Sequence, residues 1–174
     1  MTIHSEHPFL EPPDRRRTLR RLRARWPAGV SVWTAHGRRP VGLTISSMLL
    51  SDGDPGGVVG LVDPDTDLMD AIEETGRFTV SLLSDSQSPI ADAFAGLTPA
   101  PGGPFTLGIW HDHENGPWLA GATATLAVSV TDTTAVSGWS RLVRGTITDL
   151  PTPLDEQAEP LAHLRGRYGT VRQD

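Results

Sequence analysis

Short runs of alternating apolar and polar residues follow one another along this chain, and turn residues separate them. Residues 30–35 and 41–48 are two such runs, rich in β-branched side chains, with Gly37 and Pro40 between them. This pattern is typical of a β-hairpin. Comparable runs predict further strands at residues 58–62, 78–83, 105–110, 122–132, 140–150 and 161–168. The strand at 58–62 is expected to be buried.

A helical pattern precedes the hairpin. Leu19, Leu22 and Trp26 are spaced i, i+3 and i+7, which places them on one face of a helix predicted for residues 14–25. The rest of that helix is rich in arginine, at positions 15–17, 20, 21, 23 and 25. We expect a solvated helix face, near a phosphate-bearing ligand or an acidic partner; a patch for nucleic acid or a membrane is the alternative.

Two shorter helices are predicted between the strands. One covers residues 68–75 and should end at Gly76, which suits a left-handed terminal position. The other has Pro89 at its first position, Ser86 or Ser88 as its N-cap, and ends at Gly96. About seven strands with three short helices predict a mainly β (α+β) fold, an antiparallel barrel with helical additions. Residues 1–13 are predicted to be a flexible arm, and residues 14–174 one domain.

The composition excludes several kinds of chemistry. The chain has no cysteine, so disulfides, zinc–thiolate sites and cysteine nucleophiles are ruled out. All 15 basic residues are arginine, which also rules out a Schiff-base or P-loop lysine. A net charge of −6 provides no global attraction for nucleic acid. With no long apolar run and no leader-like N-terminus, we expect no membrane association and a cytoplasmic location.

Two segments carry groups that suit a ligand. Thr44, Ile45, Ser46 and Ser47 end the second strand of the predicted hairpin, where hydroxyls and free backbone groups can bind a flat polar molecule. An ordinary turn is the alternative. The segment 63–67 then leads into the second helix, whose N-terminus can bind a phosphate. The alternative there is a capped helix start with acidic residues in its first turn.

Other candidate groups are weaker. Phe94 can stack on a ring or simply belong to the core. His111 and His113 form an H-x-H pair with the spacing of two metal ligands on a strand, but the following N-G-P indicates an exposed turn, so we expect no functional metal. The chain contains neither the G-x-S-x-G segment of hydrolases nor the G-x-G-x-x-G segment of dinucleotide-binding folds.

Taken in order, these segments resemble the flavin reductase family of FMN-binding split barrels, from about Leu19 to Tyr168. The matching segments are W-P-A-G-V at 26–30, V-G-L-T-I-S-S-M at 41–48, D-P-D-T-D at 63–67, G-R-F-T-V-S-L-L at 76–83, Q-S-P-I-A-D-A-F-A-G at 87–96, G-P-W-L-A-G-A-T-A-T-L at 116–126 and R-G-R-Y at 165–168. Several ordered matches are far more specific than any one of them.

The resemblance implies a split-barrel homodimer that binds FMN, or the related FAD, and uses NAD(P)H as co-substrate. The flavin accepts a hydride from the nicotinamide, and the protein supplies placement and shielding, so no catalytic acid, base or nucleophile is required. Such reductases often serve a separate monooxygenase. The resemblance assigns Thr44, Ile45, Ser46 and Ser47 to the flavin ring, Pro64, Asp65 and Thr66 to the ribityl phosphate, and Phe94 and Trp139 as ring neighbours.

Two departures from the family pattern leave alternatives open. Many members carry G-D-H where this chain has G-W-S at residues 138–140. Trp139 can stack on a ring but cannot carry a proton, so the first alternative is a flavin carrier or sensor without turnover. A distant alternative is an adaptor that binds nucleic acid or membranes through the arginine-rich helix. The phosphate loop is also more acidic than in many members, and Arg77, Arg141 or Arg144 is the expected compensation.

Overall fold

The computed structural model describes residues 18, 19, 21–155 and 157–170. The predicted arm at residues 1–13 and the start of the first predicted helix lie outside these residues. Residues 18, 19 and 21–23 are helical and are called the N-terminal helix below. Among the described residues, no helix combines the length and the apolar character needed to cross a membrane.

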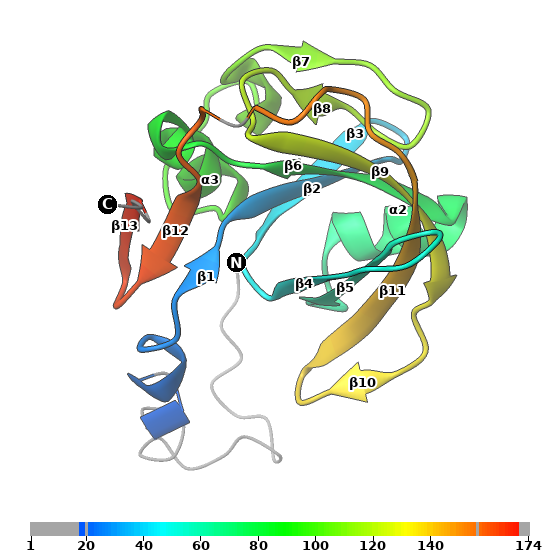
Figure 1. Ribbon diagram of the computed structural model, residues 1–174, viewed down its shortest axis with the longest axis horizontal. Helices are drawn as coiled ribbons and strands as arrows, with labels where there is room; N and C mark the ends of the chain where they lie inside the picture. Colours follow the sequence, from blue (N-terminus) through cyan, green and yellow to red (C-terminus); the bar gives the residue numbers. More distant parts are fainter. Residues whose placement is uncertain (1–17, 20, 156, 171–174) are drawn as a thin grey trace.

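An eight-stranded sheet, antiparallel throughout, is the framework of the protein (Figure 1). Its strands follow the order β3-β2-β6-β9-β11-β5-β4, and β10 pairs with β11 beside this path. They are β2 (Ser31–His36), β3 (Pro40–Ile45), β4 (Met48–Ser51), β5 (Gly57–Val62), β6 (Arg77–Leu82), β9 (Ala124–Asp132), β10 (Val136–Ser137) and β11 (Ser140–Asp149). The two end strands, β3 and β4, are consecutive in the chain and only two residues apart. The sheet therefore curves round on itself into the predicted α+β barrel.

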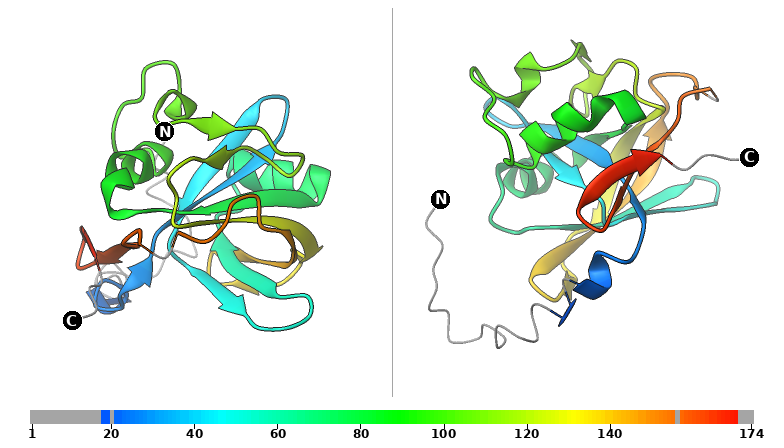
Figure 2. Two further views of the ribbon diagram at one scale, coloured as in Figure 1. Left: turned by 45° about the horizontal axis from the view of Figure 1, so that its top comes forward. Right: turned by 90° about the vertical axis from the view of Figure 1, so that its left-hand side faces the viewer.

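Two small sheets flank this barrel. One contains β1 (Ala28–Gly29), β12 (Leu161–Leu164) and β13 (Arg167–Thr170), and the other pairs β7 (Trp110–His111) with β8 (Trp118–Leu119). Figure 2 shows the hairpin of β12 and β13 at one side of the barrel, close to the N-terminal helix. The start and the end of the described chain therefore lie side by side.

Two α-helices pack on the barrel. Helix α2 (Asp67–Thr75) is capped by Thr66, whose Oγ1 accepts a hydrogen bond from the Met69 N–H at 3.3 Å, and ends at Gly76 with a left-handed φ of 66°. The end at Gly76 agrees with the prediction, and the helix begins one residue before the predicted start. Helix α3 (Ser88–Phe94) follows the 3-10 helix η1 (Asp85–Gln87) without a break.

The predicted cap of α3 is wrong. Its N-cap is Gln87, rather than Ser86 or Ser88. The turn starts earlier, at Ser84, whose backbone N–H donates to the Gln87 Oε1 at 3.0 Å. The glutamine side chain satisfies the first free N–H of the turn, so the serine nearest Pro89 is not needed as a cap.

Three strand predictions need correction. The run at 105–110 contains the 3-10 helix η2 (Pro104–Thr106), with only its end in β7, because its aromatic side chains pack into a core instead of pairing as a strand. The run at 161–168 is two strands around a turn at Arg165 and Gly166, which have positive φ values of 55° and 77°. The run at 41–48 is also divided, since β3 ends at Ile45 and β4 begins at Met48.

The main core lies inside the barrel and is centred on Trp33 of β2. The Trp33 ring stacks on Phe78 with centroids 4.4 Å apart. Its far edge lies against Gly60 of β5, where an added Cβ would be 2.6 Å from the Trp33 ring. The second core packs α3 and the flanking sheets against the outside of the barrel, through residues that include Val30, Leu83, Phe94, Leu119 and Leu161.

Tyr168 fastens the β12–β13 hairpin to α3. Its hydroxyl donates a hydrogen bond to the Asp92 Oδ1 at 2.9 Å. Burial, together with the hydrogen bond to Asp92 and the negative charge of Asp92, raises the pKa of Tyr168 to about 12.

We expect Gly60→Ala to destabilise the protein by about 1–3 kcal/mol, because the new methyl group overlaps the Trp33 ring in a packed core. Gly169→Ala in β13 is the matched control, since a Cβ there would meet no atom within 4 Å. Urea unfolding of both variants measures the difference. Equal stabilities for the two variants would contradict the close contact between Trp33 and Gly60.

We expect the absorbance change of tyrosine ionisation to have its midpoint near pH 12 in the folded protein. The chain contains one tyrosine, no cysteine and no lysine, so the signal belongs to a single residue. Because the folded pKa exceeds the ordinary value of about 10, the stability linked to Tyr168 is complete below about pH 10 and is lost as the pH rises toward the folded pKa.

The free energy of unfolding of the wild type should therefore fall more steeply than that of Tyr168→Phe from about pH 9 to about pH 11. Urea titrations across this range provide the comparison. Parallel pH profiles for the two proteins would show that the folded pKa of Tyr168 is ordinary.

Candidate functional site

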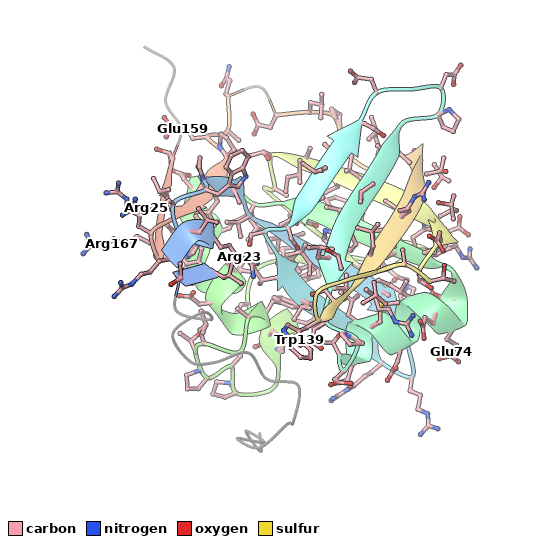
Figure 3. The ribbon with its side chains drawn as sticks, turned by 90° about the horizontal axis from the view of Figure 1, so that it is seen from below. Arg23, Arg25, Glu74, Trp139, Glu159 and Arg167 are labelled. Carbon is pink, nitrogen blue, oxygen red and sulfur yellow. The ribbon has the colours of Figure 1, made fainter. Side chains whose placement is uncertain are left out.

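A cavity of about 600 Å³ lies where the N-terminal helix, the junction of β3 with β4, and the β12–β13 hairpin meet. Its lining includes Arg23, Trp26, Ser46, Ser47 and His163. The cavity therefore joins one of the predicted ligand-binding segments to both ends of the described chain. Figure 3 views the protein from below and shows Arg23 beside the N-terminal helix.

Ser46 and Ser47 form the polar wall of this cavity because they interrupt the strand ladder between β3 and β4. Ser47 is held in place on β5, since its C=O accepts from the Leu61 N–H at 3.3 Å and its hydroxyl donates to the Leu61 C=O at 3.0 Å. Ser46 makes no hydrogen bond with any other residue that the structure describes. Its hydroxyl and its backbone groups are therefore free to bind a ligand.

Thr44 and Ile45 point to other neighbours. The Thr44 hydroxyl donates to the Ala91 C=O at 2.7 Å and so ties β3 to α3. Ile45 is buried in the main core, and its C=O accepts from the Ser31 hydroxyl at 2.8 Å. Of the four residues predicted for the ring, the structure places Ser46 and Ser47 at the cavity, while Thr44 and Ile45 fix the strand that leads to it.

The remaining walls of the cavity are largely apolar. Pro27, Met48 and Leu61 line it together with the backbone of the β1 segment. Apolar surfaces with a few convergent polar groups are typical of sites for flat ligands. The lining therefore fits a flat ring that has a polar and an apolar edge, such as the ring of a flavin.

Pro64, Asp65 and Thr66 lie outside this cavity, in the exposed loop between β5 and α2. The Thr66 hydroxyl caps α2 and also donates to the Asp63 C=O at 2.8 Å, and the Asp65 N–H donates to the Asp63 Oδ1 at 3.0 Å. The loop is therefore built as a capped helix start. The free N–H groups at the N-terminus of α2 remain suited to a phosphate.

One of the three arginines expected to balance this acidic loop is well placed. Arg77 pairs with Glu114 at 3.1 Å, and Arg144 pairs with Asp132 at 4.0 Å. Arg141 has no ion pair with the described residues, and it lies opposite Val62, the last residue of β5 before the loop. Of these three arginines, Arg141 is the one that lies opposite the end of β5 and has no ion pair with the described residues, while Arg39 lies 4.0 Å from Asp67 in the first turn of α2.

The two aromatic candidates have opposite environments. Phe94 is buried in the second core, where its ring lies 4.9 Å from Phe105 and 5.3 Å from Trp110 between centroids. Trp139 is 61% exposed at the turn between β10 and β11, on the face shown in Figure 3. The structure therefore places Phe94 as a packing residue and leaves Trp139 accessible to another molecule.

The H-x-H pair does not converge on one point. His111 stacks on Trp118 with centroids 4.3 Å apart, whereas His113 Nε2 lies 3.7 Å from the Asp149 Oδ2. In the part of the chain that the structure describes, no group of three or more His, Asp or Glu side chains is arranged to hold a metal.

The sequence did not indicate that Arg23, Trp26 and His163 line the cavity. They come from opposite ends of the chain and meet because β1 pairs with β12, with Ala28 opposite His163. Two-residue strands such as β1 leave almost no periodic signal, so this pairing is not readable from the hydrophobic pattern.

Comparison with known proteins bears on this site. The flavin reductase like domain family matches residues 23–172 of the chain. The reductase component of 4-nitrophenol 4-monooxygenase/4-nitrocatechol 2-monooxygenase from Rhodococcus opacus is 28% identical over 162 residues, which cover 92% of this chain and 83% of that protein.

Solved structures give the same result. The NADH:FAD oxidoreductase SgcE6 of Streptomyces globisporus C-1027 superposes with a TM-score of 0.81 at 25% identity, covering 97% of this chain and 100% of that one. Its complex with NAD and FAD fragments gives 0.82 at the same 25% identity, with 95% and 98% covered. Nitrilotriacetate monooxygenase component B from Mycobacterium thermoresistibile gives 0.81 at 26% identity, with 91% and 88% covered.

The family match spans most of the chain, from the N-terminal helix through β13, and the resemblance found in the sequence is confirmed. The fold, an α+β split barrel, is the one shared with flavin reductases of solved structure. This protein therefore belongs to the flavin reductase like domain family and is an oxidoreductase of the flavin reductase type.

Proposed function

We propose that this protein transfers a hydride from NAD(P)H to a flavin whose ring lies against Ser46 and Ser47. The observation that carries this proposal is the interruption between β3 and β4, where Ser47 is fixed on Leu61 and Ser46 has no hydrogen bond within the described chain. Similar proteins are named for this activity, among them the NADH:FAD oxidoreductase whose structure contains NAD and FAD fragments.

A bound flavin supplies the redox chemistry by accepting a hydride at N5. The protein's own groups position it. Ser47 holds the segment rigid through its two hydrogen bonds to Leu61, so Ser46 can present its hydroxyl and N–H in a fixed direction. Met48, Leu61 and Pro27, which line the cavity, would pack on the ring and keep water away from it.

The ribityl phosphate of the flavin is proposed to bind at Pro64, Asp65 and Thr66. The N-terminal N–H groups of α2 point away from the helix there, and the helix dipole favours a negative charge. Arg141, which lies opposite the end of β5, would balance the charges of Asp63, Asp65 and Asp67. These groups support FMN, whose phosphate follows directly on the ribityl chain, as the minimal flavin.

A second copy of the chain is proposed to complete the site. Large apolar side chains are exposed on β4 and on the β10–β11 hairpin: Leu49 by 72%, Leu50 by 51%, Val136 by 65% and Trp139 by 61%. An exposed apolar surface of this kind usually marks a contact between proteins. In a homodimer, Trp139 of one subunit would be available to stack on the flavin or nicotinamide of either site.

The physiological acceptor of the reduced flavin is proposed to be a separate monooxygenase. The relative from Rhodococcus opacus is named as the reductase component of such an enzyme. A cytoplasmic location would suit a reductase that draws on NAD(P)H.

A flavin carrier or sensor without turnover is the second candidate. The observation in its favour is the segment Gly138-Trp139-Ser140, which stands where many members of the family have G-D-H, so that no histidine is present there to relay a proton.

We expect Ser46→Ala to raise the dissociation constant of FMN by about 3- to 10-fold, the effect of losing one hydrogen bond to the ligand. Fluorescence quenching of FMN measures this constant. Thr98→Ala is the control, because Thr98 is exposed and makes no hydrogen bond with the described residues. Unaltered FMN binding by Ser46→Ala, with a wild-type free energy of unfolding, would place the ring elsewhere.

Under anaerobic conditions, we expect NADH or NADPH to bleach the visible absorption band of protein-bound FMN. Trp139→Ala should slow this bleaching by about 2- to 12-fold, since an aromatic stacking contact contributes about 0.5–1.5 kcal/mol, and Trp139→Phe should restore most of the rate. A band that persists in the wild type with both nucleotides would favour the carrier or sensor.

A further inference from the structure

Four exposed arginines lie on the side of the molecule where the cavity opens, and one of them, Arg23, lines the cavity. Arg23, Arg25, Arg165 and Arg167, called the arginine rim below, form no ion pair with the residues that the structure describes. All four are exposed. The proposed function, as argued from Ser46, Ser47 and the α2 loop, makes no use of them.

The fold brings the rim together from two distant segments. Arg23 is the last residue of the N-terminal helix and Arg25 lies in the turn after it, while Arg165 lies in the turn between β12 and β13 and Arg167 begins β13. The Arg165 N–H donates to the Ala24 C=O at 2.7 Å, which clamps this turn to the end of the helix. Arg23 and the neighbouring Gly166 both line the cavity. Figure 3 shows Arg23, Arg25 and Arg167 on one side of the molecule.

This arrangement is unusual for so acidic a chain. The formal net charge is −6, so carboxylates are plentiful, and three other arginines, Arg39, Arg77 and Arg144, lie within 4.0 Å of one. Arginines that the fold brings to one side carry like charges, and a bound anion would offset their repulsion. Because Arg23 lines the cavity and the Arg165 turn is bound to the end of the same helix, this side of the cavity favours an anionic ligand.

We propose that the arginine rim binds the pyrophosphate of a dinucleotide whose ring end lies in the cavity. The guanidinium group forms two parallel hydrogen bonds with phosphate oxygens, and several such groups suit the two charges of a pyrophosphate. Arg23 and Ser46 line the same cavity, so one molecule can reach both. This inference rests on the proposed function, which accounts for the flavin ring and its first phosphate but not for a second one.

Two dinucleotides share this chemistry, NAD(P)H and FAD. In both, the pyrophosphate joins the redox-active half to an adenosine. An extended surface for nucleic acid or for an acidic protein is less favoured, because Arg23 lines the cavity itself and the chain has a net charge of −6.

The test compares Arg23→Gln and Arg167→Gln with Arg38→Gln. Arg38 is an equally exposed arginine in the turn between β2 and β3, away from the cavity, and it has no ion pair with the described residues. Calorimetry measures the binding of ADP, FAD, FMN and NAD⁺ to each purified protein, so the readout does not depend on turnover. The same titrations at higher salt measure the ionic part of each binding constant.

We expect each rim variant to weaken ADP binding by about tenfold, the effect of removing one charge-assisted hydrogen bond. FMN binding should be unchanged in both, and Arg38→Gln should match the wild type. A parallel loss for FAD would identify the flavin as the source of the pyrophosphate, and a parallel loss for NAD⁺ would identify the nicotinamide nucleotide.

The outcomes separate this inference from the proposed function. Suppose that the wild type binds FMN and that every variant binds ADP, FAD and NAD⁺ with the wild-type dissociation constants. This result would overturn the role of the arginine rim but leave the proposed function intact. Wild-type protein that fails to bind FMN would overturn the proposed function, and the inference with it. The inference would also be overturned if single-stranded DNA bound the wild type more tightly than ADP does and if Arg23→Gln abolished this DNA binding. That result would assign the rim to nucleic acid.

Discussion

The contact of Trp33 with Gly60 is the constraint on which the architecture depends. Trp33 belongs to β2, near one end of the sheet, and Gly60 belongs to β5, near the other end. Their contact requires that no side chain project at position 60, and the stack of Trp33 on Phe78 fixes the ring that fills the barrel. This contact holds β2 close to β5. The end strands β3 and β4, which neighbour β2 and β5 in the sheet, therefore also come together, and Ser46 and Ser47 connect them along the chain.

The interruption at Ser46 and Ser47 follows from this closure. A continuous ladder would have used the backbone groups of both residues, whereas the turn into β4 leaves those of Ser46 free and fixes Ser47 on Leu61. The flanking sheet of β1, β12 and β13 then supplies the opposite wall. The site thus lies on the outside of the barrel, between the closure and the meeting point of the two ends of the described chain, and the arginine rim belongs to the same outer wall.

Much of this was readable from the sequence, for physical reasons that differ between elements. The barrel strands and α2 were predicted because period-2 alternation and the terminal Gly76 are local signals. Thr66 was assigned to a phosphate, and the structure shows that it caps α2. Positions 46 and 47 were singled out because hydroxyls at a strand end do not look like core. The α3 cap, the η2 segment and the pairing of β1 with β12 were missed, since a glutamine side chain, tertiary packing and a two-residue strand leave no local pattern.

A crystal structure of the protein with FMN bound would show whether the flavin ring lies at the closure of the barrel. We expect the isoalloxazine ring in the cavity, with its polar edge within hydrogen-bonding distance of Ser46 and the phosphate of FMN at the N-terminus of α2. Electron density for the ring at another surface, with the cavity beside Ser46 and Ser47 filled only by water, would contradict this expectation.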